Sequence, residues 1–284
     1  LLRTGQSASS LPGAPTIAEL SAGLKGEIEV IVWSRLTGPG TTTGTDTLLW
    51  RCASSFPLPG PREGQPIQNL PGISLGEISL SFSVGDQLIV FPSKLVGSGV
   101  TGLSDDAILV SAFSTQVLSL AREGQQVPTL PNGVVYSGFG PTVTDGGRVL
   151  FLAAIAGPGI DATNDKVLML ADGRNVSAPA SIVARTGDAA PGSPPGTVFT
   201  DFDGGLVLSQ PDYAGFGGRV LIPGIPNPVA GIWGAIGTRI AEIARVGGNV
   251  TLPGGQSKTI SQLLFMSGSG GRDGAATGMG RRGG

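Results

Sequence analysis

The chain alternates between short apolar runs and turns rich in glycine and proline. In runs such as Ile78–Ser83, apolar and polar residues alternate with a period of two, which is typical of a half-buried strand. Others, such as Gln87–Phe91, are mostly apolar. No window keeps a 3.6-residue apolar period over three turns, so the pattern predicts strands and no helices.

One small pattern recurs along the chain: an apolar strand that ends in an Arg-x-Gly turn, clearest at Ile182–Asp188 with Gly187 as its glycine. The arginines of this pattern are 59, 60, 63 and 60 residues apart, at Arg3, Arg62, Arg122, Arg185 and Arg245. Aspartates spaced by 60 and 59 residues suggest the same period, at Asp46, Asp106 and Asp165. A fixed period of this length indicates a repeat architecture.

Each unit contains about four short strands in roughly 60 residues, which favours one blade of a β-propeller. Tandem sandwich domains would need about 100 residues each, and a parallel β-helix would show a shorter period. We therefore predict an all-β fold, a β-propeller or propeller-like array of about four to five four-stranded blades in an incomplete ring. The domain spans residues 1–266, with units ending near 62, 122, 185 and 245 and a partial fifth after 246. Residues 267–284 are glycine-rich and lack branched aliphatic and aromatic residues, which predicts disorder.

The predicted strands of the first two units are Glu27–Trp33, Thr47–Cys52, Ile78–Ser83, Gln87–Phe91, Ala107–Phe113 and Val117–Ala121. Those of the third unit are Val134–Phe139, Arg148–Ala154, Val167–Leu170 and Ser181–Arg185. Those of the fourth unit are Arg219–Ile222, a strand that opens at Gly231, and Ile240–Arg245. The strand Thr259–Met266 begins the fifth unit. An open arc leaves sheet surfaces exposed, so we expect poor solubility.

The repeats resemble a family of bacterial tandem-repeat proteins described by an Asn-x-x-Gly-x-x-Ala-Phe motif. The similarity is carried by Ala184–Asp188 with Pro191-Gly192, by Gly157–Ile160 with Asn164-Asp165, and by Gly231–Trp233. In the third unit Gly147 and Phe151 match the motif, whereas Thr144 and Leu150 replace its asparagine and alanine. The resemblance implies propeller-like repeats in a secreted or surface-anchored protein, and it implies no catalytic residues.

Composition narrows the possible functions. The net charge is −2 without a basic stripe, which argues against nucleic-acid binding, and the longest apolar runs are too short to span a bilayer. The chain starts at Leu1 without a visible signal peptide, so we expect a processed form or a fragment. It has one cysteine, Cys52, and no histidine, which excludes an intrachain disulfide, a Ser-His-Asp triad and the commonest zinc ligand sets.

The remaining candidate chemistry is carboxylate chemistry, at Asp105, Asp106, Asp165, Asp201 and Asp203. Aspartates that recur at fixed positions are more typical of turns, whose backbone amides they bind. Asp201 and Asp203 precede two glycines, as acidic residues do in some calcium loops, so calcium is the one cofactor that the sequence suggests.

The repeated arginine is predicted to bind carbonyls or a carboxylate of the adjacent blade, which is a structural role. Trp33, Trp50 and Trp233 are predicted to serve blade packing; a sugar-binding platform is the alternative.

Two functions remain open. The first is a non-enzymatic, extracellular or cell-surface repeat protein that binds an unknown protein or glycan through its loops, or acts as a scaffold. The second is a carboxylate-dependent propeller enzyme that acts on a polysaccharide, which needs two carboxylates at a suitable distance.

Overall fold

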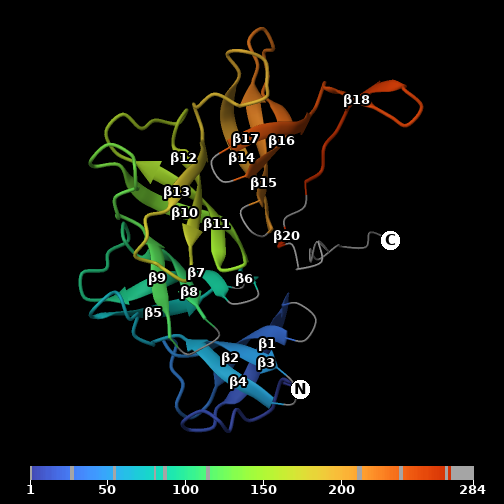
Figure 1. Cartoon of the computed structure of the whole chain (residues 1–284). Coiled ribbons are helices and arrows are strands. Elements are labelled where there is room, and N and C mark those ends of the chain that lie inside the picture. The colour runs from blue at the N-terminus through green and yellow to red at the C-terminus, as the bar shows by residue number, and fades with distance from the viewer. Residues whose placement is uncertain are drawn as a thin grey trace.

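Four antiparallel sheets follow one another along the chain, each built from consecutive strands. The computed structural model describes residues 2–25, 29–53, 56–79, 81–85, 88–112, 116–209, 213–236, 239–265 and 268–269. The described residues contain strands and turns and no helix, as the period-two pattern predicts, so none of these residues belongs to a helix able to cross a membrane. Figure 1 shows the sheets in chain order, from the blue N-terminal sheet to the orange C-terminal sheet at the opposite end of an open array.

The first two sheets are up-and-down meanders. The first blade runs in the order β1 (Thr16–Lys25), β2 (Glu29–Thr37), β3 (Thr47–Ala53) and β4 (Phe56–Arg62). The second blade runs in the order β5 (Ile73–Ile78), β7 (Ile89–Gly97), β8 (Asp106–Ser111) and β9 (Leu118–Arg122), and β6 (Ser83–Val84) also pairs with β7.

The next two sheets repeat this plan. The third blade contains β10 (Val135–Asp145), β11 (Arg148–Ala156), β12 (Lys166–Asp172) and β13 (Ser181–Arg185). The fourth contains β14 (Val198–Ser209), β15 (Tyr213–Leu221), β16 (Val229–Ile236) and β17 (Arg239–Arg245), and β20 (Gly268–Ser269) pairs in parallel with β14. A hairpin of β18 (Asn249–Thr251) and β19 (Ser257–Thr259) follows. Of the predicted tail 267–284, only β20 lies within the described residues.

The inner blades are buried on both faces, which explains their nearly continuous apolar strands. In β11 the side chains of Val149, Phe151 and Ala153 pack toward the second blade, and that of Leu150 packs toward the fourth. The turn into β11 is tight because Gly146 and Gly147 both have positive φ values, of 56° and 83°. Successive blades are therefore joined by three apolar cores, one in each interface.

The sequence missed three first strands, β1, β5 and β14, and the last strand β4. The predicted strand Ile78–Ser83 was wrong, because β5 ends at Ile78 and β6 begins at Ser83. Of the predicted strand Thr259–Met266, only Thr259 lies in a strand among the described residues.

In β14, residues Asp201–Gly205 were predicted to form a turn because of their acidic and glycine residues. They lie instead in the strand, at a point where its register with β15 shifts between Phe202 and Leu206. A β-bulge tolerates glycine and acidic residues that a regular strand disfavours.

The outer face of the fourth blade carries large apolar side chains in contact with solvent. Tyr213, Leu221, Ile236 and Ile243 are 49%, 39%, 58% and 68% exposed. Tyr213 pairs with Ile236 across β15 and β16, which places both on one face of the sheet. Exposed apolar patches of this kind favour self-association.

We expect Ile243→Lys to reduce self-association, because it puts a charge on this face at its most exposed apolar residue. Leu58→Lys, at a 54% exposed position of β4 in the first blade, is the matched control. Both changes should alter the free energy of unfolding by only about 0.5 kcal/mol. Light scattering against protein concentration should fall for Ile243→Lys alone; equal scattering by both variants would show that this face does not drive association.

Candidate functional site

The Arg-x-Gly turn forms the junction between one blade and the next. Its glycine has a φ of 78° to 84° at every junction, a left-handed conformation that favours glycine. The glycine N–H donates to a carbonyl on or leading into the first strand of the next blade: Gly64 to Leu75 at 2.7 Å, Gly124 to Tyr136 at 2.8 Å, and Gly187 to Phe199 at 2.8 Å. Gly5 makes the same bond to Ile17 in β1, at 2.8 Å, whereas Gly247 donates to Ile260, just after the β18–β19 hairpin, at 2.8 Å. The repeated pattern is therefore a blade connector.

The arginine side chain closes a loop of its own blade. The Nε atoms of Arg62, Arg122 and Arg185 each donate at 3.0 Å to the carbonyls of Thr45, Ser104 and Asn164, respectively. These carbonyls end the loop between the second and third strands of the same sheet. The prediction of a carbonyl partner in the adjacent blade was wrong, because the fourth strand ends beside the loop that enters the third.

The other two junction arginines differ. Arg245 forms an ion pair from its Nε to Glu242 Oε1 at 3.1 Å. Arg3 lies in the first junction, where its carbonyl accepts a hydrogen bond from Gln6 N at 3.2 Å. Position and backbone geometry are thus repeated, whereas the group that meets the guanidinium varies.

The structure changes the register of the repeated aspartates. The carbonyls of Asp46, Asp105 and Asp165 accept equivalent hydrogen bonds from Leu36, Leu95 and Ile155, at 2.7, 2.6 and 2.7 Å. Asp105 is therefore the true equivalent of Asp46 and Asp165, and the assignment of Asp106 was wrong by one residue. Because Asp105 and Asp106 are adjacent, either one fits a spacing of 59 or 60 residues from Asp46 and Asp165. Asp106 is instead equivalent to Thr47 and Lys166. The carbonyl of each of these three residues accepts a hydrogen bond from the backbone N–H of the residue that follows the junction arginine.

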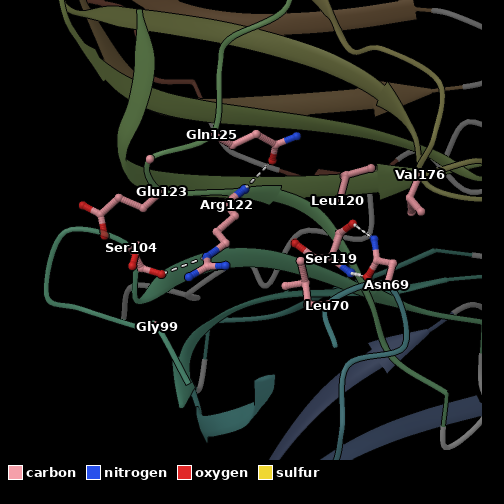
Figure 2. A pocket seen from close by; sticks show the side chains of 11 residues that line it. Asn69, Leu70, Gly99, Ser104, Ser119, Leu120, Arg122, Glu123, Gln125 and Val176 are labelled. Carbon is pink, nitrogen blue, oxygen red and sulfur yellow. Dashed lines mark hydrogen bonds between the residues drawn. The ribbon is translucent and has the colours of Figure 1, made fainter. Parts of the chain in front are cut away.

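A pocket of about 510 Å³ lies beside the junction of the second and third blades. Figure 2 shows Arg122 in its middle, with its backbone N–H donating to Gln125 Oε1 at 3.0 Å and its Nε to the Ser104 carbonyl. At the other end Asn69 binds the backbone of Ser119 on both sides: its Nδ2 donates to the carbonyl and its Oδ1 accepts from the N–H, each at 2.8 Å. Leu70, Leu120 and Val176 form the apolar wall.

An equivalent pocket of about 520 Å³ surrounds Arg62. The Arg62 guanidinium makes one more hydrogen bond than that of Arg122, because its Nη2 also donates to the Gly40 carbonyl at 3.1 Å. Glu63, which follows Arg62, is buried and accepts at Oε2 from Thr47 N at 3.2 Å and from Thr47 Oγ1 at 3.0 Å. Burial raises the pKa of Glu63, and a hydrogen bond with the Asp46 carboxyl group raises it further.

Acidic residues also surround the junction of the third and fourth blades. Hydrogen bonds from Thr163 lower the pKa of Asp161, and the charge of Arg185 adds to this effect. Burial raises the pKa of Asp188, while Arg185 acts in the opposite direction. Arg185 thus has two carboxylates of its own chain within electrostatic reach.

Within the described residues, one cluster of three acidic side chains has the spacing of a metal site, but a lysine ammonium group contacts two of them. The carboxylate oxygens of Asp105, Asp106 and Glu123 lie within 4.8 Å of one another. Lys94 Nζ contacts Asp105 Oδ1 and Asp106 Oδ2, both at 3.0 Å. These hydrogen bonds raise the pKa of Lys94, so the ammonium group stays charged between the two aspartates.

The predicted calcium residues have separate outcomes. Asp201 Oδ1 accepts from Lys166 Nζ at 2.6 Å and from Phe202 N at 2.8 Å, so one of its oxygens is already occupied. The side chain of Asp203 lies outside the described residues. Calcium binding here stays a prediction.

Cys52 and the tryptophans are structural. Burial raises the pKa of the half-buried Cys52 thiol, which lowers its reactivity. Trp33 and Trp50 are buried and donate their indole N–H to the Ile78 carbonyl and Ser34 Oγ, at 2.9 and 2.7 Å. Trp233 packs edge-on against Phe199, with ring centroids 4.9 Å apart. The predicted packing role of all three is confirmed.

Sequence reasoning missed the neighbours that complete the Arg122 pocket, including Asn69, Ser104 and Gln125. The signal for Gln125 was present, because Gln65 occupies the same place one unit earlier. Asn69 gave no such signal, since its role depends on the edge of β9, 50 residues away.

Arg185→Ala should destabilise the protein by about 1–2 kcal/mol, because it removes a charge-assisted hydrogen bond to the Asn164 carbonyl. Arg239→Ala, at an exposed position of β17, serves as the control and should change stability by about 0.5 kcal/mol or less. Thermal melting measures both, at about 2–4 °C for each kcal/mol in a chain of this size. Equal melting temperatures for the two variants would show that the junction arginine does not stabilise the fold.

Comparison with known proteins places the chain in a family. No curated protein matches it. Among solved structures, it is similar to the Penicillium chrysogenum alpha-L-arabinanase complexed with arabinobiose, at 10% identity and a TM-score of 0.35 over 83% of this chain and 68% of that chain. It is also similar to an oligogalacturonate lyase in complex with manganese, at 11% identity and a TM-score of 0.35 over 88% of this chain and 73% of that chain. A family model described as "Family of unknown function (DUF7453)" matches residues 67–258, most of the array of blades, and the chain belongs to this family.

Proposed function

We propose that the chain is a non-enzymatic binding scaffold whose recognition sites are the pockets at the blade junctions. The observation that supports this most is the recurrence of one pocket at two successive junctions, with an arginine oriented by a backbone carbonyl. A repeated pocket on a rigid array of sheets suits recognition, since the surrounding loops can vary without disturbing the strands.

The state of the carboxylates supports binding over catalysis. Lys94 pairs with Asp105 and Asp106, and Lys166 pairs with Asp201. A carboxylate held in an ion pair is a poor general base, because the ion pair stabilises its charged form. We infer an extracellular or cell-surface setting from the resemblance of the repeats to secreted proteins, and a protein or glycan as partner.

A second candidate is a carboxylate-dependent enzyme that acts on a polysaccharide. It is favoured by the Asp46–Glu63 pair beside the Arg62 pocket, since a carboxyl group with a raised pKa can serve as a general acid. The contacts of Glu63 with Thr47 weigh against it, because they hold this oxygen at the start of β3.

One pair of assays separates the two functions. The immobilised chain would be probed with a glycan array and an array of peptides, and the same polysaccharides would be assayed for release of reducing ends or unsaturated products. Binding scaffolds retain a ligand without turnover, and we expect Arg122→Gln to weaken that retention and Arg239→Gln, at an exposed position of β17, to leave it unchanged. Turnover that is lost in Glu63→Gln would overturn the binding proposal in favour of the enzyme.

A further inference from the structure

We propose that the pocket around Arg122 binds the C-terminal carboxylate of a peptide whose last side chain is aliphatic. This inference rests on the proposed binding function and names the ligand of one of its sites. It follows from the free donors of Arg122, from a comparison of the junctions, and from the wall of the pocket.

The Arg122 guanidinium is held in one orientation, but not all of its hydrogen-bond donors have a partner. Its Nε donates to the Ser104 carbonyl at 3.0 Å, and its backbone N–H is held by Gln125. Within the described part of the chain, neither Nη atom of Arg122 has a hydrogen-bond or ion-pair partner. A half-buried guanidinium held at Nε presents its remaining donors in a fixed plane, which suits a carboxylate.

The two later junctions show what this guanidinium lacks. Arg245 meets Glu242, and Arg185 has Asp161 and Asp188 within electrostatic reach. At the second-blade junction the positions of Asp161 and Asp188 are occupied by the neutral residues Thr101 and Gln125. The chain supplies a carboxylate at the later junctions, and we infer that a ligand supplies it here.

The acids near Arg122 leave room for such a ligand. Lys94 pairs with both Asp105 and Asp106. Glu123 turns one oxygen toward the Asp106 N–H, at 3.4 Å, and lies at the end of the pocket opposite Asn69 and Val176 (Figure 2). The ligand carboxylate therefore approaches Arg122 from the apolar end.

That end of the pocket favours a peptide over a sugar. Leu70, Leu120 and Val176 offer an aliphatic wall, and none of the described residues that line the pocket is aromatic. A sugar ring is commonly held by an aromatic face, whereas an aliphatic side chain gains from burial against leucine and valine. Asn69 already occupies the backbone N–H and carbonyl of Ser119 on the edge of β9, so the contacts left for the ligand are the guanidinium and the aliphatic wall.

The probes are N-acetyl-L-leucine and N-acetyl-L-leucinamide, which differ only in the carboxylate. Titration followed by two-dimensional amide NMR should show saturable shifts at Gln125 and Gly124 with the acid. We expect the amide, and the acid with Arg122→Gln, to bind at least about tenfold more weakly, which is the effect of losing a charged hydrogen bond.

Two further variants keep the test decisive if Arg122→Gln folds poorly. Gln125→Glu places a carboxylate where the third junction has Asp188; it should abolish binding while the melting temperature stays near that of the wild type. Arg239→Gln, at an exposed position of β17 away from the junction pockets, should leave binding unchanged.

Equal binding of acid and amide, or binding that survives both Arg122→Gln and Gln125→Glu, would overturn the proposal. Methyl glucuronide is the third probe, and its binding in place of N-acetyl-L-leucine would contradict the peptide while keeping the site. If all three probes fail but the arrays retain a ligand, the binding function stands and this assignment of its ligand falls.

Discussion

The structure depends on one hydrogen bond that is repeated at each junction between two blades: from a glycine N–H, at a φ that favours glycine, to a carbonyl near the start of the next blade. This bond turns the chain from the outermost strand of one sheet into the first strand of the following sheet. Once the turn is made, the apolar faces of successive sheets meet. Burial between sheets then supplies most of the stabilisation, since no single four-stranded sheet can bury both its faces alone.

The same constraint explains why candidate chemistry gathers at the junctions. Arg62, Arg122 and Arg185 each end a strand beside the loop that enters the third strand of the same blade, so each of these guanidinium groups meets a carbonyl there. What else it meets is free to vary. Glu242 approaches it in the fourth blade, Gly40 in the first, and in the second it faces an open pocket.

Much of the fold could be predicted from the sequence, because glycines with positive φ and strand periodicity are local properties. Strands β4, β9, β13 and β17 end at Arg62, Arg122, Arg185 and Arg245, the positions marked by the Arg-x-Gly spacing. Strand β14 was missed since the bulge around Asp201–Gly205 is stabilised by its pairing with β15, which no local pattern shows. The site could be predicted only in part: the arginines were identified, but the Asp105 register and the role of Asn69 depend on contacts between strands.

Native-state hydrogen exchange tests the central role of the junction bond most directly. The amides of Gly64, Gly124 and Gly187 lie in turns, where exchange is ordinarily fast, yet each donates to a carbonyl at 2.7 or 2.8 Å. Our account predicts that they exchange as slowly as amides of the buried strands, such as that of Leu150. Exchange as fast as that of the exposed loop residue Gly102 would contradict it.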